Sequence, residues 1–132
     1  MRIIASLILF GLFVSVSPAF AEDVFDGTKP LLCSSIEALD CDPGVTCERG
    51  IPEIMGAPQF LRIDFAKKEI AGPKRITAIR MMEKDDDQIV LQGYEIGLGW
   101  TLAIDRGTGN MRITFAGGDS SFIIFGACTA NP

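Results

Sequence analysis

The chain has 132 residues, a formal net charge of −5 and no histidine. Its length corresponds to a single domain. The lack of histidine excludes Ser-His-Asp and Cys-His nucleophile activation, and it removes the commonest zinc and copper ligand. The acidic balance argues against nucleic acids and anionic membrane surfaces as partners, because both need a basic protein face. It permits a cationic protein as a partner, although the charge can equally serve solubility alone.

Residues 1–21 carry the three parts of a cleavable secretory signal peptide. Arg2 supplies the positive start, an almost unbroken apolar run covers residues 3–16, and Ala19 and Ala21 place small residues before the cleavage point. This run is shorter than the roughly 20 residues that a membrane span needs. We therefore predict an exported protein, periplasmic or extracellular, with no membrane segment in its mature form. The short signal is typical of bacteria.

The mature chain is predicted to be one domain with two stretches of different composition. Residues 22–58 are rich in cysteine, proline and glycine, and we expect this N-terminal segment to pack on a sheet formed by residues 59–132. Removal of the leader takes one basic residue and no acidic residue, which leaves 11 basic and 17 acidic side chains. The net charge of the mature domain is therefore −6.

The four cysteines, Cys33, Cys41, Cys47 and Cys128, indicate a disulfide framework, because their number is even and the chain is exported. The favoured pairing is Cys33–Cys128 with Cys41–Cys47, since the first bridge closes a long loop and constrains the unfolded chain most. The alternative is Cys33–Cys41 with Cys47–Cys128. An all-cysteine zinc site is disfavoured, because the spacings do not include a Cys-x-x-Cys pair.

The N-terminal segment has weak local signals. Residues 31–39 have apolar side chains at close to helical spacing, but a strand or a single helical turn fits as well. Residues 40–58 contain repeated prolines and glycines and are predicted to be a loop held by the cysteines.

From residue 60 onward the pattern is typical of strands. Leu61, Ile63 and Phe65 share one face while Arg62 and Asp64 share the other, which indicates a half-buried strand. The predicted strands are 60–65, 69–71, 76–82, 89–94, 100–104, 111–115 and 121–128. Their rhythm predicts an all-β fold, a small antiparallel meander that closes into a barrel or sandwich, with a disulfide-pinned N-terminal segment.

Two features are candidate binding sites. Tyr94 and Trp100 flank the glycines at 97 and 99, and an exposed aromatic side chain beside a loop can anchor a partner, although a tryptophan at the start of a strand more commonly belongs to the core. Asp85, Asp86 and Asp87 form an acidic turn that could dock a cationic protein, although aspartates at a hairpin tip commonly serve turn geometry. The acidic run lacks the glycine of a calcium loop. We assign no metal site, catalytic residue or cofactor.

Several stretches resemble uncharacterised small exported bacterial β-domain proteins. They are residues 60–65, 91–95, 99–105, 108–111 and 125–128. In size, cysteine content and meander the chain is also similar to the periplasmic inhibitors of C-type lysozyme, which are small β-barrels. The Ser-Gly loop before an aromatic tyrosine that marks that family is not present here, so the resemblance carries over no inhibitory residue.

These features favour an exported, non-catalytic binding or inhibitor module that acts through an acidic surface on a protein partner. One alternative is a carrier of small apolar ligands, which requires a sizeable internal cavity. The other is a carboxylate-only hydrolase, which requires two acidic groups that converge in a cleft.

Overall fold

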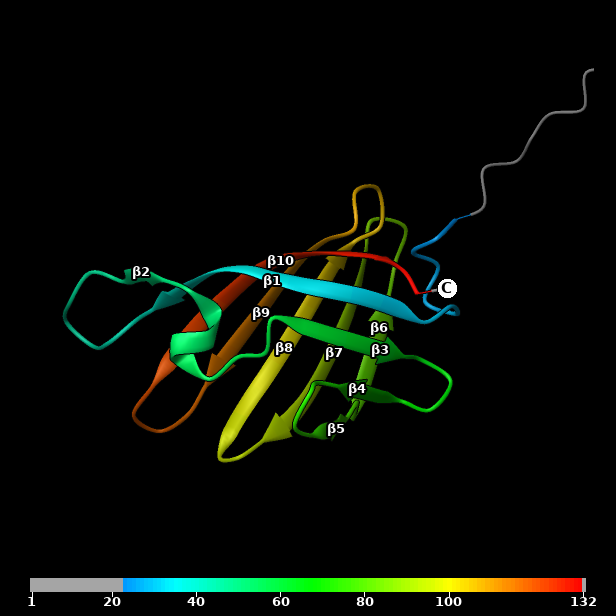
Figure 1. Ribbon diagram of the computed structural model, residues 1–132. Coiled ribbons are helices and arrows are strands. Elements are labelled where there is room, and N and C mark those ends of the chain that lie inside the picture. Colours follow the sequence, from blue (N-terminus) through cyan, green and yellow to red (C-terminus); the bar gives the residue numbers. More distant parts are fainter. Residues whose placement is uncertain (1–22, 132) are drawn as a thin grey trace, which may run out of the picture.

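The computed structural model describes residues 23–131, and the predicted leader, residues 1–21, lies outside this part of the chain. The described residues form one antiparallel sheet of ten strands with a short 3₁₀ helix beside it (Figure 1). The elements are β1 Leu31–Asp40, β2 Glu48–Gly50, η1 Pro52–Met55, β3 Phe60–Asp64, β4 Glu69–Ala71, β5 Ile76–Ala78, β6 Met81–Lys84, β7 Gln88–Glu95, β8 Leu98–Asp105, β9 Asn110–Ala116 and β10 Ser121–Ala130.

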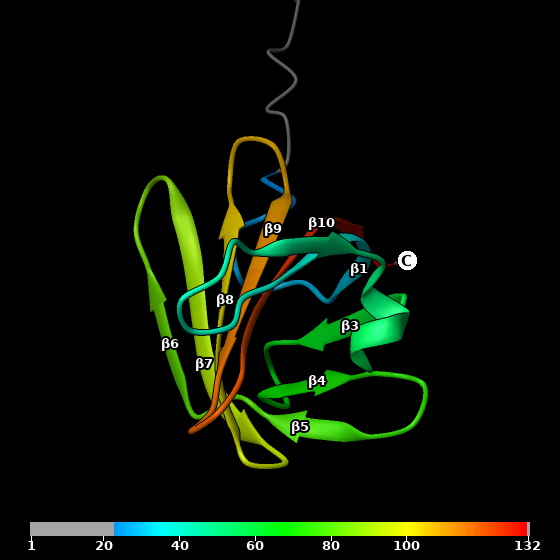
Figure 2. The same ribbon diagram turned by 90° about the vertical axis from the view of Figure 1, so that its left-hand side faces the viewer.

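The sheet is curled into a half-barrel, which Figure 2 shows with β3, β4 and β5 facing the longer strands β7 to β9. The strand order is β5-β4-β3-β1-β10-β9-β8-β7-β6, and β2 pairs with β1 off this path. Strands β5 and β6 lie at the two ends of the order but follow one another in the chain. Between them, the backbone N–H of Ile79 donates to Lys68 and that of Arg80 donates to Gln92, both at 2.8 Å.

The all-β, antiparallel prediction is confirmed, and most strands from residue 60 onward begin and end within two residues of their predicted bounds. The predicted strand 76–82 is instead divided into β5 and β6. These two pieces pair with different partners, β4 and β7, because the chain crosses here from one arm of the half-barrel to the other. A local apolar pattern carries no information about such a change of partner.

The position of the N-terminal segment differs from the predicted fold. Residues 31–40 form β1, a central strand between β3 and β10, and do not lie over the sheet as a pinned segment. Cys33 pairs with Cys128 directly opposite it on β10, so this disulfide fastens two central strands. The second disulfide, Cys41–Cys47, closes the loop between β1 and β2. The disulfides follow the favoured pairing, but they are not confined to the N-terminal segment.

The predicted loop 40–58 contains β2 and η1. Strand β2 pairs with the end of β1, and η1 starts with Pro52, whose fixed φ suits the first turn of a helix. Gly56 ends η1 with a φ of 78°, a conformation that glycine adopts without a steric penalty. Elements of three or four residues are too short to produce a readable hydrophobic period.

An N-terminal arm, residues 23–30, plugs one end of the half-barrel. The ring of Phe25 packs against Gly109, where a larger residue would collide with it. Arg106 anchors the arm: its Nε donates to the carbonyl of Phe25 at 3.1 Å, and its guanidinium forms an ion pair with Asp23. The same guanidinium donates to the carbonyl of Asp85 at 2.7 Å, which ties the arm to the β6–β7 turn. This end is therefore closed by the chain itself.

Candidate functional site: an apolar cavity in the half-barrel

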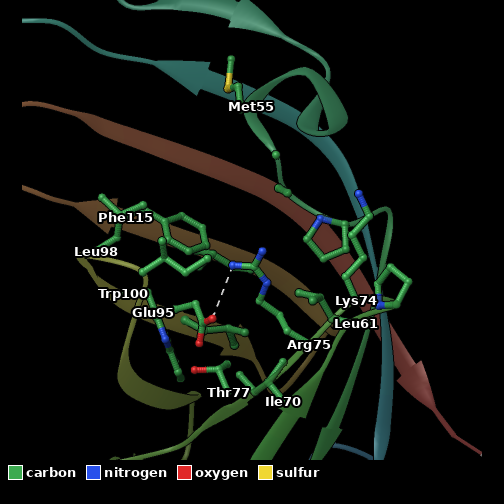
Figure 3. A pocket seen from close by; sticks show the side chains of 18 of the residues that line it. Met55, Leu61, Ile70, Lys74, Arg75, Thr77, Glu95, Leu98, Trp100 and Phe115 are labelled. Carbon is green, nitrogen blue, oxygen red and sulfur yellow. Dashed lines mark ion pairs between the residues drawn. The ribbon is translucent and has the colours of Figure 1, made fainter.

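A cavity of about 600 Å³ lies inside the curl of the sheet, toward the end opposite the plug (Figure 3). This position follows from the antiparallel meander, in which the end of one strand lies beside the start of the next. The last residues of β7 and β9 and the first residues of β8 and β10 therefore meet at one end of the sheet, where they line the cavity. The lining residues are Glu53, Met55, Gly56, Ala57, Pro58, Gln59, Leu61, Ile70, Gly72, Pro73, Lys74, Arg75, Thr77, Glu95, Ile96, Leu98, Trp100, Leu102, Ile113, Phe115 and Phe122.

The cavity walls are mostly apolar because alternate residues of each strand face inward. On β8 the inward positions Trp100 and Leu102 line the cavity, and the next inward residue, Ile104, is completely buried below them. Strand β9 is antiparallel to β8, so the order is reversed. Met111, early in β9, is buried below the cavity, and Ile113, later in the strand, lies in the cavity wall. The same alternation that builds the core therefore builds the cavity floor.

Trp100 occupies a constrained position in this wall. The residue is only 5% exposed, and its cross-strand partner on β7 is Gly93. A Cβ at Gly93 would collide with the indole ring and would lie 2.7 Å from the carbonyl oxygen of Ala78 on β5. The ring thus fits only because position 93 has no side chain, and the opposite arm approaches the same position through Ala78.

Two buried polar atoms in the cavity wall have no hydrogen-bond partner in the part of the chain that the structure describes. They are the indole Nε1 of Trp100 and the hydroxyl oxygen of Thr77. In the view of Figure 3 both side chains lie near Glu95. Buried polar side-chain atoms in folded proteins are usually paired. Both residues line the same cavity, so its wall contains two polar groups whose hydrogen-bonding capacity is unused among the described residues.

The rim of the cavity carries an ion pair between its two sides. Arg75, from the loop between β4 and β5, places Nη1 3.5 Å from Oε1 of Glu95 at the end of β7 (Figure 3). The two side chains are 51% and 31% exposed. Pairs as exposed as this one contribute only about 0–1 kcal/mol. The contact therefore links the two arms without locking them together.

The β7–β8 turn places a strained residue at the same rim. Ile96 has a φ of 47° and is followed by Gly97 with a φ of 80°. Two-residue hairpin turns with positive φ at both positions favour Asn-Gly, whereas a β-branched side chain in this region is a conformational outlier. Ile96 is also 69% exposed, so neither backbone geometry nor core packing accounts for isoleucine here. An apolar side chain held at the rim in spite of strain is a feature of functional sites.

The structure places the predicted binding residues in three separate locations. Trp100 lies in the cavity wall, whereas Tyr94, its neighbour across the β7–β8 ladder, faces outward and is 56% exposed. Asp85, Asp86 and Asp87 form the β6–β7 turn at the plugged end. At about 3.3 Å per residue, the length of β7 puts roughly 20 Å between this turn and Tyr94.

Within the acidic turn, Asp85 serves the turn itself. Its Oδ1 accepts hydrogen bonds from the backbone N–H of Gln88 at 2.8 Å and of Asp87 at 2.9 Å. The hydrogen bond from Gln88, followed by that from Asp87, lowers the pKa of the Asp85 carboxyl. Asp86 and Asp87 remain exposed.

Sequence reasoning did not single out Thr77, Arg75 or Ile96. No sequence pattern distinguished Thr77 and Arg75. They belong to the cavity only because β5 and the loop before it lie close to β7 and β8 in the folded chain. Ile96 did have such a pattern: a bulky residue directly before glycine, between two predicted strands, is an unusual choice for a tight hairpin turn.

Neither metal binding nor a family likeness adds to this geometry. Among residues 23–131 there is no group of three or more His, Cys, Asp or Glu side chains that could hold a metal ion. In the same part of the chain no helix has the length and apolar character needed to cross a membrane. No protein-family model, curated protein or solved structure matches the sequence. The cavity is therefore the candidate functional site.

Proposed function

We propose that this protein is an exported binding protein for a small, mainly apolar ligand, which it holds in the half-barrel cavity. The observation that carries the proposal is the cavity of about 600 Å³ with its mostly apolar wall. Sites for small molecules typically measure about 300–1,000 Å³ and combine apolar walls with a few placed polar groups. Trp100 and Thr77 are such groups here.

A cavity of this kind is unfavourable without an occupant. Apolar surface in contact with water costs about 25 cal/mol per Å², and protein interiors otherwise contain few voids larger than a water molecule. A ligand that contacts both Ile70 on β4 and Trp100 on β8 would cover this surface and connect the two arms. We thus propose that the bound ligand closes the half-barrel into the small barrel expected from the sequence.

Export belongs to the same proposal. Two disulfides are typical of proteins that fold in an oxidising compartment, and the favoured signal peptide would direct the chain there. A carrier outside the cytosol would capture its ligand in the periplasm or the medium and needs no cofactor to do so.

The two other functions expected from the sequence have weaker geometric support. An acidic docking surface for a cationic protein would use Asp86 and Asp87 at the plugged end, and it predicts association that weakens as salt increases. A hydrolase needs two converging carboxyl groups. Among the described residues, the carboxyl groups that line the cavity are those of Glu53 and Glu95. Glu95 already forms an ion pair with Arg75, which weakens the case for a pair of catalytic carboxyl groups.

The test uses a neutral apolar fluorophore, N-phenyl-1-naphthylamine. Trp100 is the only tryptophan, so energy transfer from it to the bound fluorophore detects binding, and the variants below assign that binding to the cavity. We expect saturable binding with one site per chain. Ala57→Phe adds a ring inside the cavity and should weaken binding at least about tenfold, a change of 1.4 kcal/mol. Ala116→Phe makes the same substitution on the exposed side of β9 and should leave binding unchanged. Equal binding by both variants would contradict the proposal.

A further inference from the structure

We propose that the cavity selects neutral ligands whose buried end carries a hydrogen-bond acceptor, such as the carbonyl oxygen of an apolar ketone or lactone. This inference rests on the proposed function and names the ligand class of the same site. Its basis is the pair of unpartnered polar atoms in the cavity wall, the indole Nε1 of Trp100 and the hydroxyl of Thr77.

The indole of Trp100 defines the polarity that the ligand must present. An indole N–H donates a hydrogen bond and cannot accept one, so its missing partner is an acceptor. Buried tryptophans usually find such a partner. With its ring held against Gly93, Trp100 cannot turn the N–H toward solvent without leaving its place in the wall. A purely hydrocarbon ligand would leave this donor unpaired.

Thr77 adds a second donor from the other arm of the half-barrel. Strand β5, which carries Thr77, contacts β7, and both the Ala78 carbonyl and the indole ring lie close to Gly93 of β7. The side chains of Thr77 and Trp100 both lie near Glu95 in the view of Figure 3. A carbonyl oxygen has two lone pairs, so one such atom can accept from both groups.

The distribution of charge argues that the ligand is neutral. The ionisable side chains that line the cavity are Glu53, Lys74, Arg75 and Glu95, which sum to no net charge. The deeper wall is apolar apart from the two donors, and an ion moved into such surroundings loses its hydration without a partner. An anion would also face Glu95, and a cation would compete with Arg75 for that carboxylate.

The experiment compares two probes of nearly equal shape, benzophenone and diphenylmethane, which differ by a carbonyl in place of a methylene. Each displaces N-phenyl-1-naphthylamine, whose own fluorescence is excited directly so that the readout does not depend on Trp100, and the displacement gives the affinity of each probe. Thr77→Val removes the hydroxyl with little change in shape. Trp100→Phe removes the indole N–H together with part of the ring, and diphenylmethane binding measures the effect of the altered shape. We expect each variant to bind benzophenone about tenfold more weakly, the loss of roughly one hydrogen bond, and to bind diphenylmethane within threefold of the unaltered protein.

A second measurement uses the unaltered protein and therefore does not require any variant to fold. Because Trp100 is the only tryptophan, the ¹⁵N-labelled protein has one indole N–H signal. We expect this signal to move downfield with benzophenone and to shift much less with diphenylmethane.

The outcomes separate the two proposals. If both probes bind but the variants weaken them equally, or the indole proton responds alike to both, the acceptor inference is wrong while ligand binding stands. If neither probe nor the fluorophore binds, the proposed function itself is wrong.

Discussion

The indole ring of Trp100 on β8 lies across Gly93 on β7, its directly opposed partner in the antiparallel ladder. The ring is accommodated because position 93 has no Cβ, and the Ala78 carbonyl of the opposite arm lies close to the same position. This one cross-strand pair sets the shape of the cavity wall and the position of its buried donor.

We expect Gly93→Ala to destabilise the fold. The added methyl group would collide with the indole ring and with the Ala78 carbonyl, and overpacking of this kind typically costs about 1–3 kcal/mol. Urea denaturation followed by circular dichroism measures the loss. Gly118→Ala is the control, because a Cβ at Gly118 meets nothing within 4 Å. Equal stability of the two variants would show that the ring does not depend on Gly93.

Ile96→Asn should make the protein more stable but a weaker binder. Asparagine tolerates the positive φ of this turn, so the substitution should recover about 1 kcal/mol, while the rim loses an apolar contact. Thermal unfolding and fluorophore titration measure the two effects. Lys68→Asn relieves a similar conformation, with φ of 55°, in the β3–β4 turn and should raise stability without changing affinity. Tighter binding by Ile96→Asn would contradict a role for the rim residue.

Breaking the Arg75–Glu95 pair should affect ligand exchange more than stability. Glu95→Gln removes a contact between exposed side chains, and we expect unfolding free energy to change by less than about 1 kcal/mol. The release rate of the fluorophore, measured by stopped flow, should rise because the rim opens more readily. Glu37→Gln breaks the 3.2 Å pair with Arg49, outside the cavity, and should leave that rate unchanged. A large loss of stability in Glu95→Gln would instead assign the pair a structural role.

The turn carboxylates should make stability fall in acid. The hydroxyl of Thr108, with a further hydrogen bond from the Thr108 N–H, lowers the pKa of Asp105. A carboxyl whose folded pKa is depressed stabilises the protein above its unfolded pKa of about 3.9 and loses this effect as pH falls through the lower folded value. We expect the melting temperature to fall below about pH 4, and less steeply in Asp105→Asn. Asp86→Asn, at an exposed position, should retain the steep fall.

The two disulfides should differ in their effect on stability. Cys33–Cys128 has a sequence separation of 95 and Cys41–Cys47 has one of 6. Chain entropy predicts losses of about 4–5 and about 2 kcal/mol when each pair is replaced by alanines. Guanidinium denaturation of the two double variants measures the difference. A larger loss from the short loop would mean that native contacts, and not loop closure, dominate.

Local pattern was sufficient for most of the strands. Alternation such as Leu61, Ile63 and Phe65 against Arg62 and Asp64 is a property of neighbouring residues, and strand geometry converts it directly into inner and outer faces. The turns followed from glycine and aspartate for the same reason. Residues 31–39 were ambiguous because a β-bulge between Ser35 and Glu37 shifts the alternation of buried residues within β1, and the bulge depends on the pairing with β10.

The sequence by itself determined an all-β chain, the rhythm of its strands and turns, and a framework of paired cysteines, because each depends on short-range spacing or on a count. Only the tertiary structure decided that β1 lies between β3 and β10, that β5 and β6 divide one apolar run, and that Trp100 and Thr77 share a cavity. The physical reason is that the cavity is space between two arms of a curled sheet. Its shape depends on which strands pair across long separations and on a glycine opposite a tryptophan, and no local pattern contains either relationship.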